Sequence, residues 1–170
     1  MTSGSARTDT QAMSDLETAY IGVKSLAIDV AAMTVVPFLD VLLADAAFVG
    51  AVSGDGRSIE VARVTPVSRT PARLAFPVDS AYPLAVALQS GKPFFVSSNE
   101  QLACDHPGLV RVRDEDHACA TIPLFDSTRR LVGAMNIGFA EPHQFSDDER
   151  AMLNQIAERC AAVLANPPSS

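Results

Sequence analysis

Aromatic and basic side chains are scarce in this sequence. Among 170 residues there is no tryptophan, there are two tyrosines, and the aromatic content is 6%, so the core has to be built mainly from Ala, Val, Leu and Ile. Thirteen basic residues against twenty acidic ones give a net charge of −7, and no Lys/Arg cluster interrupts this negative surplus. Such a surface repels a phosphate backbone, so we expect neither a nucleic-acid partner nor a membrane partner.

Signals for secretion, membrane insertion, disulfides and metal binding are missing as well. Residues 1–11 are polar, and no stretch approaches the roughly twenty apolar residues that cross a bilayer, so we expect a cytoplasmic protein. The three cysteines, Cys104, Cys119 and Cys160, are odd in number and irregularly spaced, which favours reduced thiols. Because the sequence has no Cys-x-x-Cys or His-x-x-x-His pair, we expect no metal site.

The composition indicates one folded domain. A hydrophobic share of 48% with 19% charged residues is typical of a packed globular chain, and 170 residues are too few for two domains that each bury a substantial core. No internal repeat or linker interrupts residues 13–165. We therefore expect a single domain over residues 13–165, between a disordered tail at 1–12 and a C-terminal tail at 166–170.

Capping signals predict the helices. Three Ser-x-x-Glu boxes, each able to satisfy free amide groups at a helix start, occur at Ser14/Glu17, Ser97/Glu100 and Ser146/Glu149. The first predicts a helix over about 13–30, followed by a second over 36–44 with Pro37 in its first turn. Further helices are expected at 81–89, capped by Ser80 and ended by Gly91, from the second box to about Cys104, and from Ser146 to Asn166.

Two β-hairpins are predicted between these helices. Residues 46–52 and 59–65 flank a Gly-rich turn, and residues 117–124 and 131–139 flank a polar turn. A short strand is expected at 92–96. Segment 66–75, which holds two prolines, and segment 105–116 are predicted to be loops.

This order of elements predicts an α+β fold with a central antiparallel sheet. We expect the N- and C-terminal helices on one face and the crossover helices and loops on the other.

Five short segments in this order resemble a known family. They are Phe76-Pro77-Val78-Asp79-Ser80, Ser90-Gly91-Lys92-Pro93, Thr121-Ile122-Pro123-Leu124, Leu131-Val132-Gly133-Ala134-Met135-Asn136-Ile137 and Phe145-Ser146-Asp147-Asp148-Glu149-Arg150. The chain resembles a GAF domain, a small-molecule sensor fold related to PAS, and is similar to those of bacterial signalling phosphatases and kinases, particularly actinobacterial ones. The resemblance implies a ligand pocket on the sheet face beneath the crossover helices.

Strand alternation then predicts which side chains face this pocket. Along 117–124, Ala118, Ala120, Ile122 and Leu124 form a core face, and the opposite face mixes polar and soft side chains, as a pocket wall often does. The candidate ligand-binding residues are Tyr82, Ser97, His106, His117, Cys119, Thr121 and Asn136. Each also has a structural alternative, namely core packing for Cys119 and Tyr82, backbone hydrogen bonding for Thr121 and Asn136, helix capping for Ser97, and simple exposure for both histidines.

The leading functional hypothesis is a non-catalytic sensory or regulatory domain. It would bind an unidentified small molecule and signal through its terminal helices in a homodimer, with an effector protein as a possible signalling partner. A second hypothesis is a dimerisation or protein-contact module without a ligand, because the apolar stripe from Met13 to Val30 has the three-four spacing of a helix seam.

A third hypothesis is enzymatic, because some free-standing GAF proteins reduce free methionine-(R)-sulfoxide with cysteines near the pocket. Cys104 and Cys119 are the candidates, but Cys119 lies within a predicted strand, whereas the family's nucleophile lies in the preceding loop. We therefore assign no catalytic residue. No cofactor is assigned either: the cyclic-nucleotide signature is missing, Cys104 and His106 are one residue too far apart for bilin attachment, and no motif supports His106 or His117 as a haem ligand.

Overall fold

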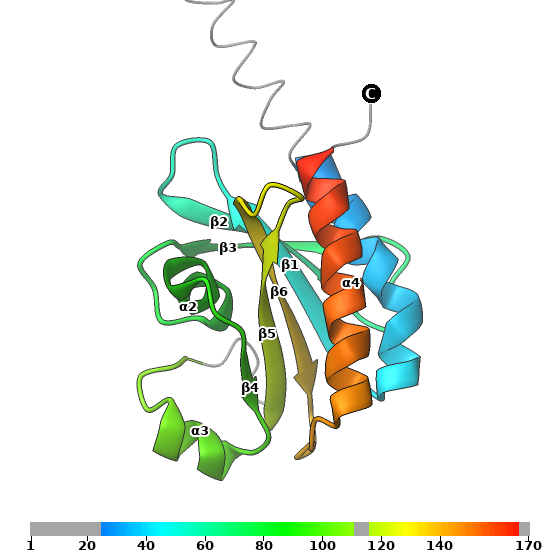
Figure 1. Cartoon of the computed structure of the whole chain (residues 1–170), viewed down its shortest axis with the longest axis vertical. Helices are drawn as coiled ribbons and strands as arrows, with labels where there is room; N and C mark the ends of the chain where they lie inside the picture. The colour runs from blue at the N-terminus through cyan, green and yellow to red at the C-terminus, as the bar shows by residue number, and fades with distance from the viewer. Residues whose placement is uncertain (1–24, 111–115, 167–170) are drawn as a thin grey trace, which may run out of the picture.

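The computed structural model describes residues 25–110 and 116–166. A six-stranded antiparallel sheet, in the order β3-β2-β1-β6-β5-β4, lies between two helical layers. The N-terminal helix (residues 25–42) and α4 lie side by side on one face, and α2 and α3 lie on the other (Figure 1). The labelled elements are β1 (Ala46–Val52), β2 (Ser58–Val64), β3 (Ala72–Pro77), α2 (Pro83–Ser90), β4 (Phe94–Val96), α3 (Asn99–Asp105), β5 (Ala118–Phe125), β6 (Leu131–Phe139) and α4 (Asp147–Ala165). The predicted α+β class and the placement of the helices are confirmed.

Both predicted hairpins are present, with boundaries that differ by one residue. β1 pairs with β2 from Ala47↔Val64 to Val52↔Ile59, and β5 pairs with β6 along their whole length. β6 also pairs with β1, which joins the two hairpins into one sheet.

The strand β3 contradicts the predicted loop over 66–75. It pairs with β2 from Ser58↔Pro77 to Arg63↔Ala72 and forms one edge of the sheet. Five of its six side chains are exposed, so the strand carries almost none of the burial pattern by which strands are recognised. Pro71 precedes the strand and Pro77 is its last residue, and an edge strand tolerates proline at both places.

The N-terminal helix corrects another prediction. Residues 25–42 form one continuous helix, so the expected break between 30 and 36 does not exist, and Pro37 lies in the helix interior. Pro37 is exposed, and water can therefore bind the carbonyl that loses its partner at this position. The predicted start of this helix, with Ser14 and Glu17, falls outside the described residues.

The composition of this helix also differs from our expectation that no stretch is apolar enough to span a bilayer. Within the described residues, Ser25–Leu42 is long and apolar enough to cross a membrane by length and composition alone, with a mean hydropathy of 1.8. Core helices of folded domains meet the same criterion, and Ile28, Val35 and Leu39 of this helix are fully buried in the core cluster that it shares with the sheet.

N-cap residues were predicted for α2, α3 and α4, and two of these three predictions are wrong. α2 begins after Tyr82 without a side-chain cap, so Ser80 does not cap it. α3 is capped by Ser98, whose Oγ accepts from the Gln101 N–H, instead of by Ser97. Ser146 caps α4 as predicted, and Gly91 ends α2 in the left-handed conformation with φ 66°.

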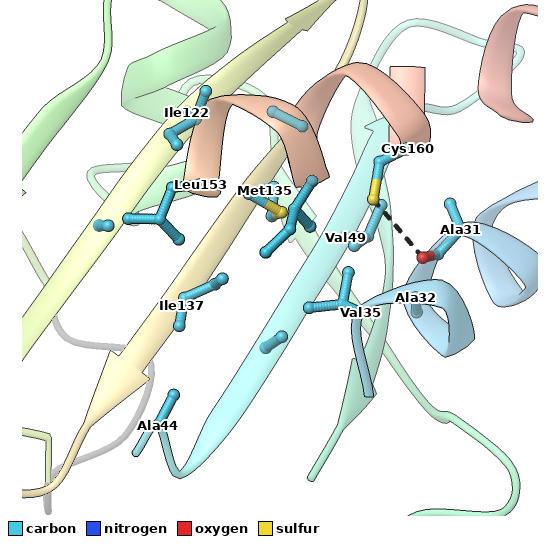
Figure 2. Packing of buried hydrophobic residues seen from close by; sticks show 14 of the residues in the cluster. Ala31, Ala32, Val35, Ala44, Val49, Ile122, Met135, Ile137, Leu153 and Cys160 are labelled. Atoms are coloured by element: carbon cyan, nitrogen blue, oxygen red, sulfur yellow. Dashed lines mark hydrogen bonds between the residues drawn. The ribbon is translucent and has the colours of Figure 1, made fainter. Parts of the chain in front are cut away.

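Two hydrophobic clusters lie on the two faces of the sheet. The larger one, between the sheet and the terminal helices, contains Ile122, Met135, Ile137 and Leu153 (Figure 2). It includes the whole predicted core face of β5. Cys160 lies in it with its thiol donating to the Ala31 carbonyl at 3.5 Å, and burial raises the pKa of this thiol to about 11. The smaller cluster lies under α2 and covers only part of that face, and a cavity lies beside it.

Candidate functional site

A small cavity lies on the α2 side of the sheet, where β4, β5 and β6 meet α3. Its volume is about 30 Å³, room for one or two water molecules. The wall is mostly apolar with a few polar groups, as in many ligand sites. The lining residues are Pro83, Val96, Leu102, Leu109, Val110, Asp116, His117, Ala118, Cys119 and Asn136.

Thr121 and Asn136 are the two buried polar residues among the described part of the chain. They are opposite each other in the β5–β6 ladder, and Asn136 Nδ2 donates to Thr121 Oγ1 at 2.7 Å. Hydrogen bonding from both side chains also lowers the pKa of the nearby Cys119 thiol, against the larger rise that burial causes. The three predicted residues therefore form one connected polar group, which reaches the cavity through Cys119 and Asn136.

The Cys119 thiol is held in its protonated form. Burial raises its pKa to about 11, the nearby Asp116 carboxylate adds to the rise, and the hydrogen bonds from Asn136 and Thr121 oppose it without cancelling it. A thiol with such a pKa is a poor nucleophile near neutral pH. In this environment Cys119 serves as a polarisable wall atom with hydrogen-bonding capacity.

His117 lies at the mouth of the cavity and contacts α3. Its Nδ1 is 2.8 Å from Nδ2 of Asn99, the first residue of α3. α3 has no fully buried residue, so this contact and the cavity-lining Leu102 are prominent among the interactions that hold the helix in place.

Of the seven candidates, His117, Cys119 and Asn136 line the cavity, and Thr121 lies behind them, bonded to Asn136. The remaining three predicted residues lie outside this group. The Tyr82 ring packs on Phe76 at 4.3 Å between centroids, and the His106 ring lies 5.3 Å from that of Phe94. Ser97 directly follows β4, and its N–H donates to Gln101 Oε1 at 2.6 Å. The structure thus brings four of the seven candidates together and distributes the others around them.

Asn99, Asp116 and the apolar wall of the cavity were not predicted from the sequence. Asp116 packs against β6 where Gly138 has no side chain, since a Cβ there would be 2.5 Å from Asp116 Oδ2. The wall residues Val96, Leu102 and Leu109 come from three separate segments that approach one another only in the folded chain. No local pattern marks them as neighbours.

Other concave regions offer less for recognition. A groove of about 610 Å³ lies on the opposite face between the end of β5 and α4. The Asp126 carboxylate in this groove accepts hydrogen bonds from the Thr128 hydroxyl, the Thr128 N–H and the Arg130 N–H of the same turn. These hydrogen bonds lower the pKa of the carboxyl. Within residues 25–110 and 116–166, no group of three or more His, Cys, Asp or Glu side chains is arranged to hold a metal ion.

A family model described as a GAF domain matches residues 28–165, nearly the whole described chain. The chain belongs to the GAF domain family. A search of curated proteins finds no significant match.

Solved GAF structures share the fold at low sequence identity. The GAF domain of a phosphoenolpyruvate-protein phosphotransferase from Coxiella burnetii superposes with a TM-score of 0.63 at 18% identity, covering 89% of each chain. The GAF-B domain of DevS from Mycobacterium smegmatis gives 0.57 at 15% identity, covering 84% of this chain and 93% of that one. A type II free methionine-R-sulfoxide reductase from Thermoplasma acidophilum gives 0.65 at 12% identity, covering 84% and 94%. Domains named as GAF domains and an enzyme named as a free methionine-R-sulfoxide reductase thus share this fold, and the likeness alone does not separate a binding module from an enzyme.

Proposed function

We propose that this GAF domain is a non-catalytic sensory or regulatory module. It binds a small molecule at the cavity between β5, β6 and α3 and passes the change to its terminal helices in a cytoplasmic homodimer, which acts on an effector protein. The observation that supports binding most directly is the connected group of Cys119, Thr121 and Asn136. Buried polar groups facing an apolar cavity orient a ligand at little cost, because they are already ordered.

The ligand cannot be larger than a few atoms unless the wall moves. The cavity holds about 30 Å³, whereas sites for drug-sized molecules enclose roughly 300–1,000 Å³. β5 and β6 are interior strands, so α3, β4 and the Leu109–Val110 segment are the parts of the wall that can shift outward.

A ligand screen tests this proposal. We expect retained ligand in native mass spectra, or a rise in melting temperature with a member of nucleotide, amino-acid, tetrapyrrole or acyl libraries, because a ligand that binds only the folded state stabilises it. Thr121→Val should weaken the effect, since it removes the acceptor that orients Asn136.

Thr34→Val is the matched control. It removes the same hydroxyl from the opposite face, where Thr34 Oγ1 donates to the Ala31 carbonyl at 2.6 Å. Equal loss of binding in both variants, or no bound molecule from any library, would contradict the proposal.

The enzymatic alternative requires a reactive thiol. Two solved relatives by fold are named as free methionine-R-sulfoxide reductases. Here the protonated Cys119 argues against a catalytic role, and Cys104 is exposed on α3 without lining the cavity. Thiol-coupled reduction of free methionine sulfoxide that is abolished by Cys104→Ser or Cys119→Ser would overturn our assignment of a non-catalytic domain.

A further inference from the structure

β4 connects the two faces of the sheet. Its alternating side chains place Val96 on the cavity wall and Phe95 against the core beneath the terminal helices. The strand pairs with β5 over three residues only, from Phe94↔Thr121 to Val96↔Cys119. A strand this short at the edge of a sheet depends on its side-chain contacts, so it belongs to the part of a fold that opens most easily.

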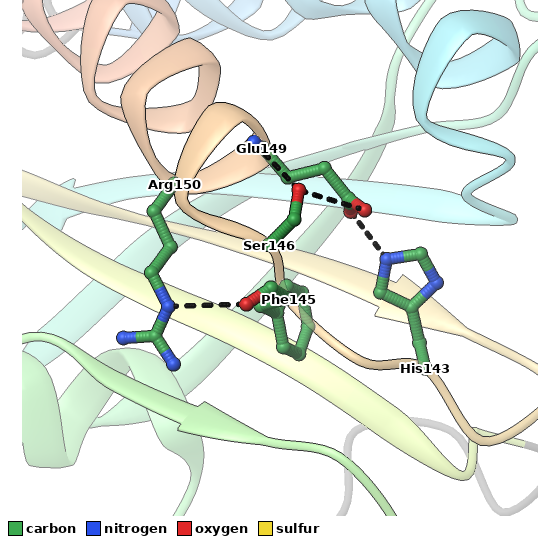
Figure 3. Close-up of polar contacts among 5 residues, drawn as sticks. All are labelled: His143, Phe145, Ser146, Glu149 and Arg150. Carbon is green, nitrogen blue, oxygen red and sulfur yellow. Dashed lines mark hydrogen bonds and ion pairs between the residues drawn. The ribbon is translucent and has the colours of Figure 1, made fainter.

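The side chain of Phe95 reaches the start of α4. Its ring lies 5.3 Å from that of Phe145, and the Arg150 guanidinium lies over it at 4.1 Å. Arg150 Nε also donates to the Phe145 carbonyl at 3.4 Å (Figure 3). Any outward movement of β4 therefore removes a packing partner from the first turns of α4.

The backbone of Ser97 makes a second connection. Its N–H donates to the Gln101 side chain of α3 at 2.6 Å, and its carbonyl accepts from the His143 N–H at 2.9 Å. Gln101 adjoins Leu102, which lines the cavity. A single residue thus ties the helix that covers the cavity to the loop that leads into α4.

His143 completes the connection to α4. Its ring is stacked on Phe139 at 4.0 Å, and its Nε2 contacts the Glu149 carboxylate (Figure 3). Ser146 Oγ accepts from the Glu149 N–H in the usual capping manner, while the Glu149 carboxylate is directed to His143 and to the Ser146 hydroxyl. The N-terminal cap of α4 therefore contacts, through Glu149 and His143, the same loop that bonds to Ser97.

We infer that Phe95, Ser97, His143, Phe145, Glu149 and Arg150 form a joint, the β4–α4 joint, through which the state of the cavity sets the stability of the start of α4. With β4 and α3 docked, every contact of the joint is made. When the wall moves outward to admit a ligand, Phe95 and Ser97 leave their partners and the first turns of α4 loosen. The claim that a ligand moves the wall rests on the proposed function. The coupling between the cavity wall and α4 can be tested without a ligand.

Hydrogen exchange on the whole chain, followed by mass spectrometry, tests the joint. Leu102→Ala loosens the cavity wall on α3, which lies on the opposite face of the sheet from α4. Amides in the first turns of α4 should then exchange roughly two- to thirtyfold faster, the range of typical coupling between linked elements, while its C-terminal half stays unchanged. Coupling is reciprocal, so Arg150→Ala should accelerate exchange in α3.

Arg159→Ala is the matched control. Arg159 lies on the same helix and over a phenylalanine in the same way, 5.4 Å from the Phe38 ring, but it contacts the N-terminal helix and not β4. It should leave α3 exchange unchanged. An unchanged α4 start in Leu102→Ala, uniform acceleration in all elements, or equal effects of Arg159→Ala and Arg150→Ala on α3 would overturn the joint. Failure of the ligand screen alone would instead count against the proposed function.

Discussion

At the scale of single residues, the pair Thr121–Asn136 decides how the cavity face differs from a plain core. Thr121 is fully buried and Asn136 is 2% exposed. Thr121→Val keeps the shape and removes the acceptor of the 2.7 Å bond, which leaves a buried amide with one partner fewer. We expect the free energy of unfolding to fall by about 1–3 kcal/mol, measured by urea denaturation.

Thr121→Ser provides the control for this prediction, because it keeps the hydroxyl and removes only a methyl group. It should retain more stability than Thr121→Val. If the valine variant is as stable as the wild type, the bond does not contribute to folding and Asn136 is satisfied in another way.

The three thiols should differ in reactivity. Cys104 is exposed, whereas the pKa of Cys119 is raised to about 11 by burial. At about pH 8, roughly one Cys119 in a thousand is then a thiolate. We expect iodoacetamide to label Cys104 well before Cys119, as determined by peptide mass spectrometry. Labelling of Cys119 at the rate of Cys104 would contradict the burial and reopen the enzymatic alternative.

Cys160 should make stability fall in mild alkali. The pKa of this thiol is about 11 in the folded protein against an ordinary value of 9.0. Between these values the unfolded thiol ionises while the folded one keeps its proton, so the unfolded state gains stability as the pH rises. The loss reaches about 1.4 kcal/mol near pH 10. Cys160→Ala, although less stable at neutral pH, should show a shallower decline in urea denaturation between about pH 8 and 10; an equal slope would contradict the shift.

At the scale of elements, prediction succeeded where local chemistry decides the structure. Ser146 and Gly91 mark α4 and the end of α2 because capping and left-handed geometry depend on a few adjacent residues. The strand β3 was missed because five of its side chains are exposed and only the ladder with β2 holds it. The helix through Pro37 was missed for a related reason: burial of residues such as Val35 and Leu39 outweighs the hydrogen bond that proline cannot make.

In the site, too, local patterns predicted some residues, and contacts distant in the sequence determine the others. Alternation along β5 and β6 correctly separates Cys119, Thr121 and Asn136 from the terminal-helix core, because strand periodicity is fixed by the backbone. Asn99 and Leu102 could not be assigned in this way. Leu102 reaches the cavity, and Asn99 reaches His117 at its mouth, through the packing of a short helix whose position depends on contacts distant in the sequence.

Gly133 and Gly91 are required for different reasons, close packing at the first and backbone conformation at the second. A Cβ at Gly133 of β6 would lie 2.5 Å from the Gly50 carbonyl oxygen and 2.7 Å from Leu164 Cδ1, so β1 or β6 would have to move. At Gly91, with φ 66°, the nearest atom would be 3.9 Å away, and only the left-handed conformation is strained. We expect Gly91→Ala to cost about 1–2 kcal/mol and Gly133→Ala to cost more or prevent folding. Thermal unfolding of both variants checks this order, and the reverse order would contradict the close approach of the strands.

At the scale of the whole molecule, the two faces of the sheet have separate tasks. One face carries the small cavity, and the other buries the N-terminal helix against α4. The proposed signal from the cavity would have to cross the sheet or pass around its edge to reach the terminal helices. β4 lies at that edge and contacts both sides, which makes the short route around the sheet physically simpler than a deformation of the tightly packed interior strands.

The proposed homodimer requires an apolar surface on the terminal helices. Val41 in the N-terminal helix is 64% exposed, and Leu43, the first residue after this helix, is 81% exposed. Burial of such side chains between two copies would stabilise association. We expect sedimentation at micromolar concentration to show a dimer, and Val41→Glu to shift it to monomer, because a charge would have to be buried in the interface. Val67→Glu is the matched control: Val67 is 87% exposed on the connection between β2 and β3, so the same change there should leave the dimer intact. A monomeric wild type, or equal dissociation of both variants, would count against signalling through paired terminal helices.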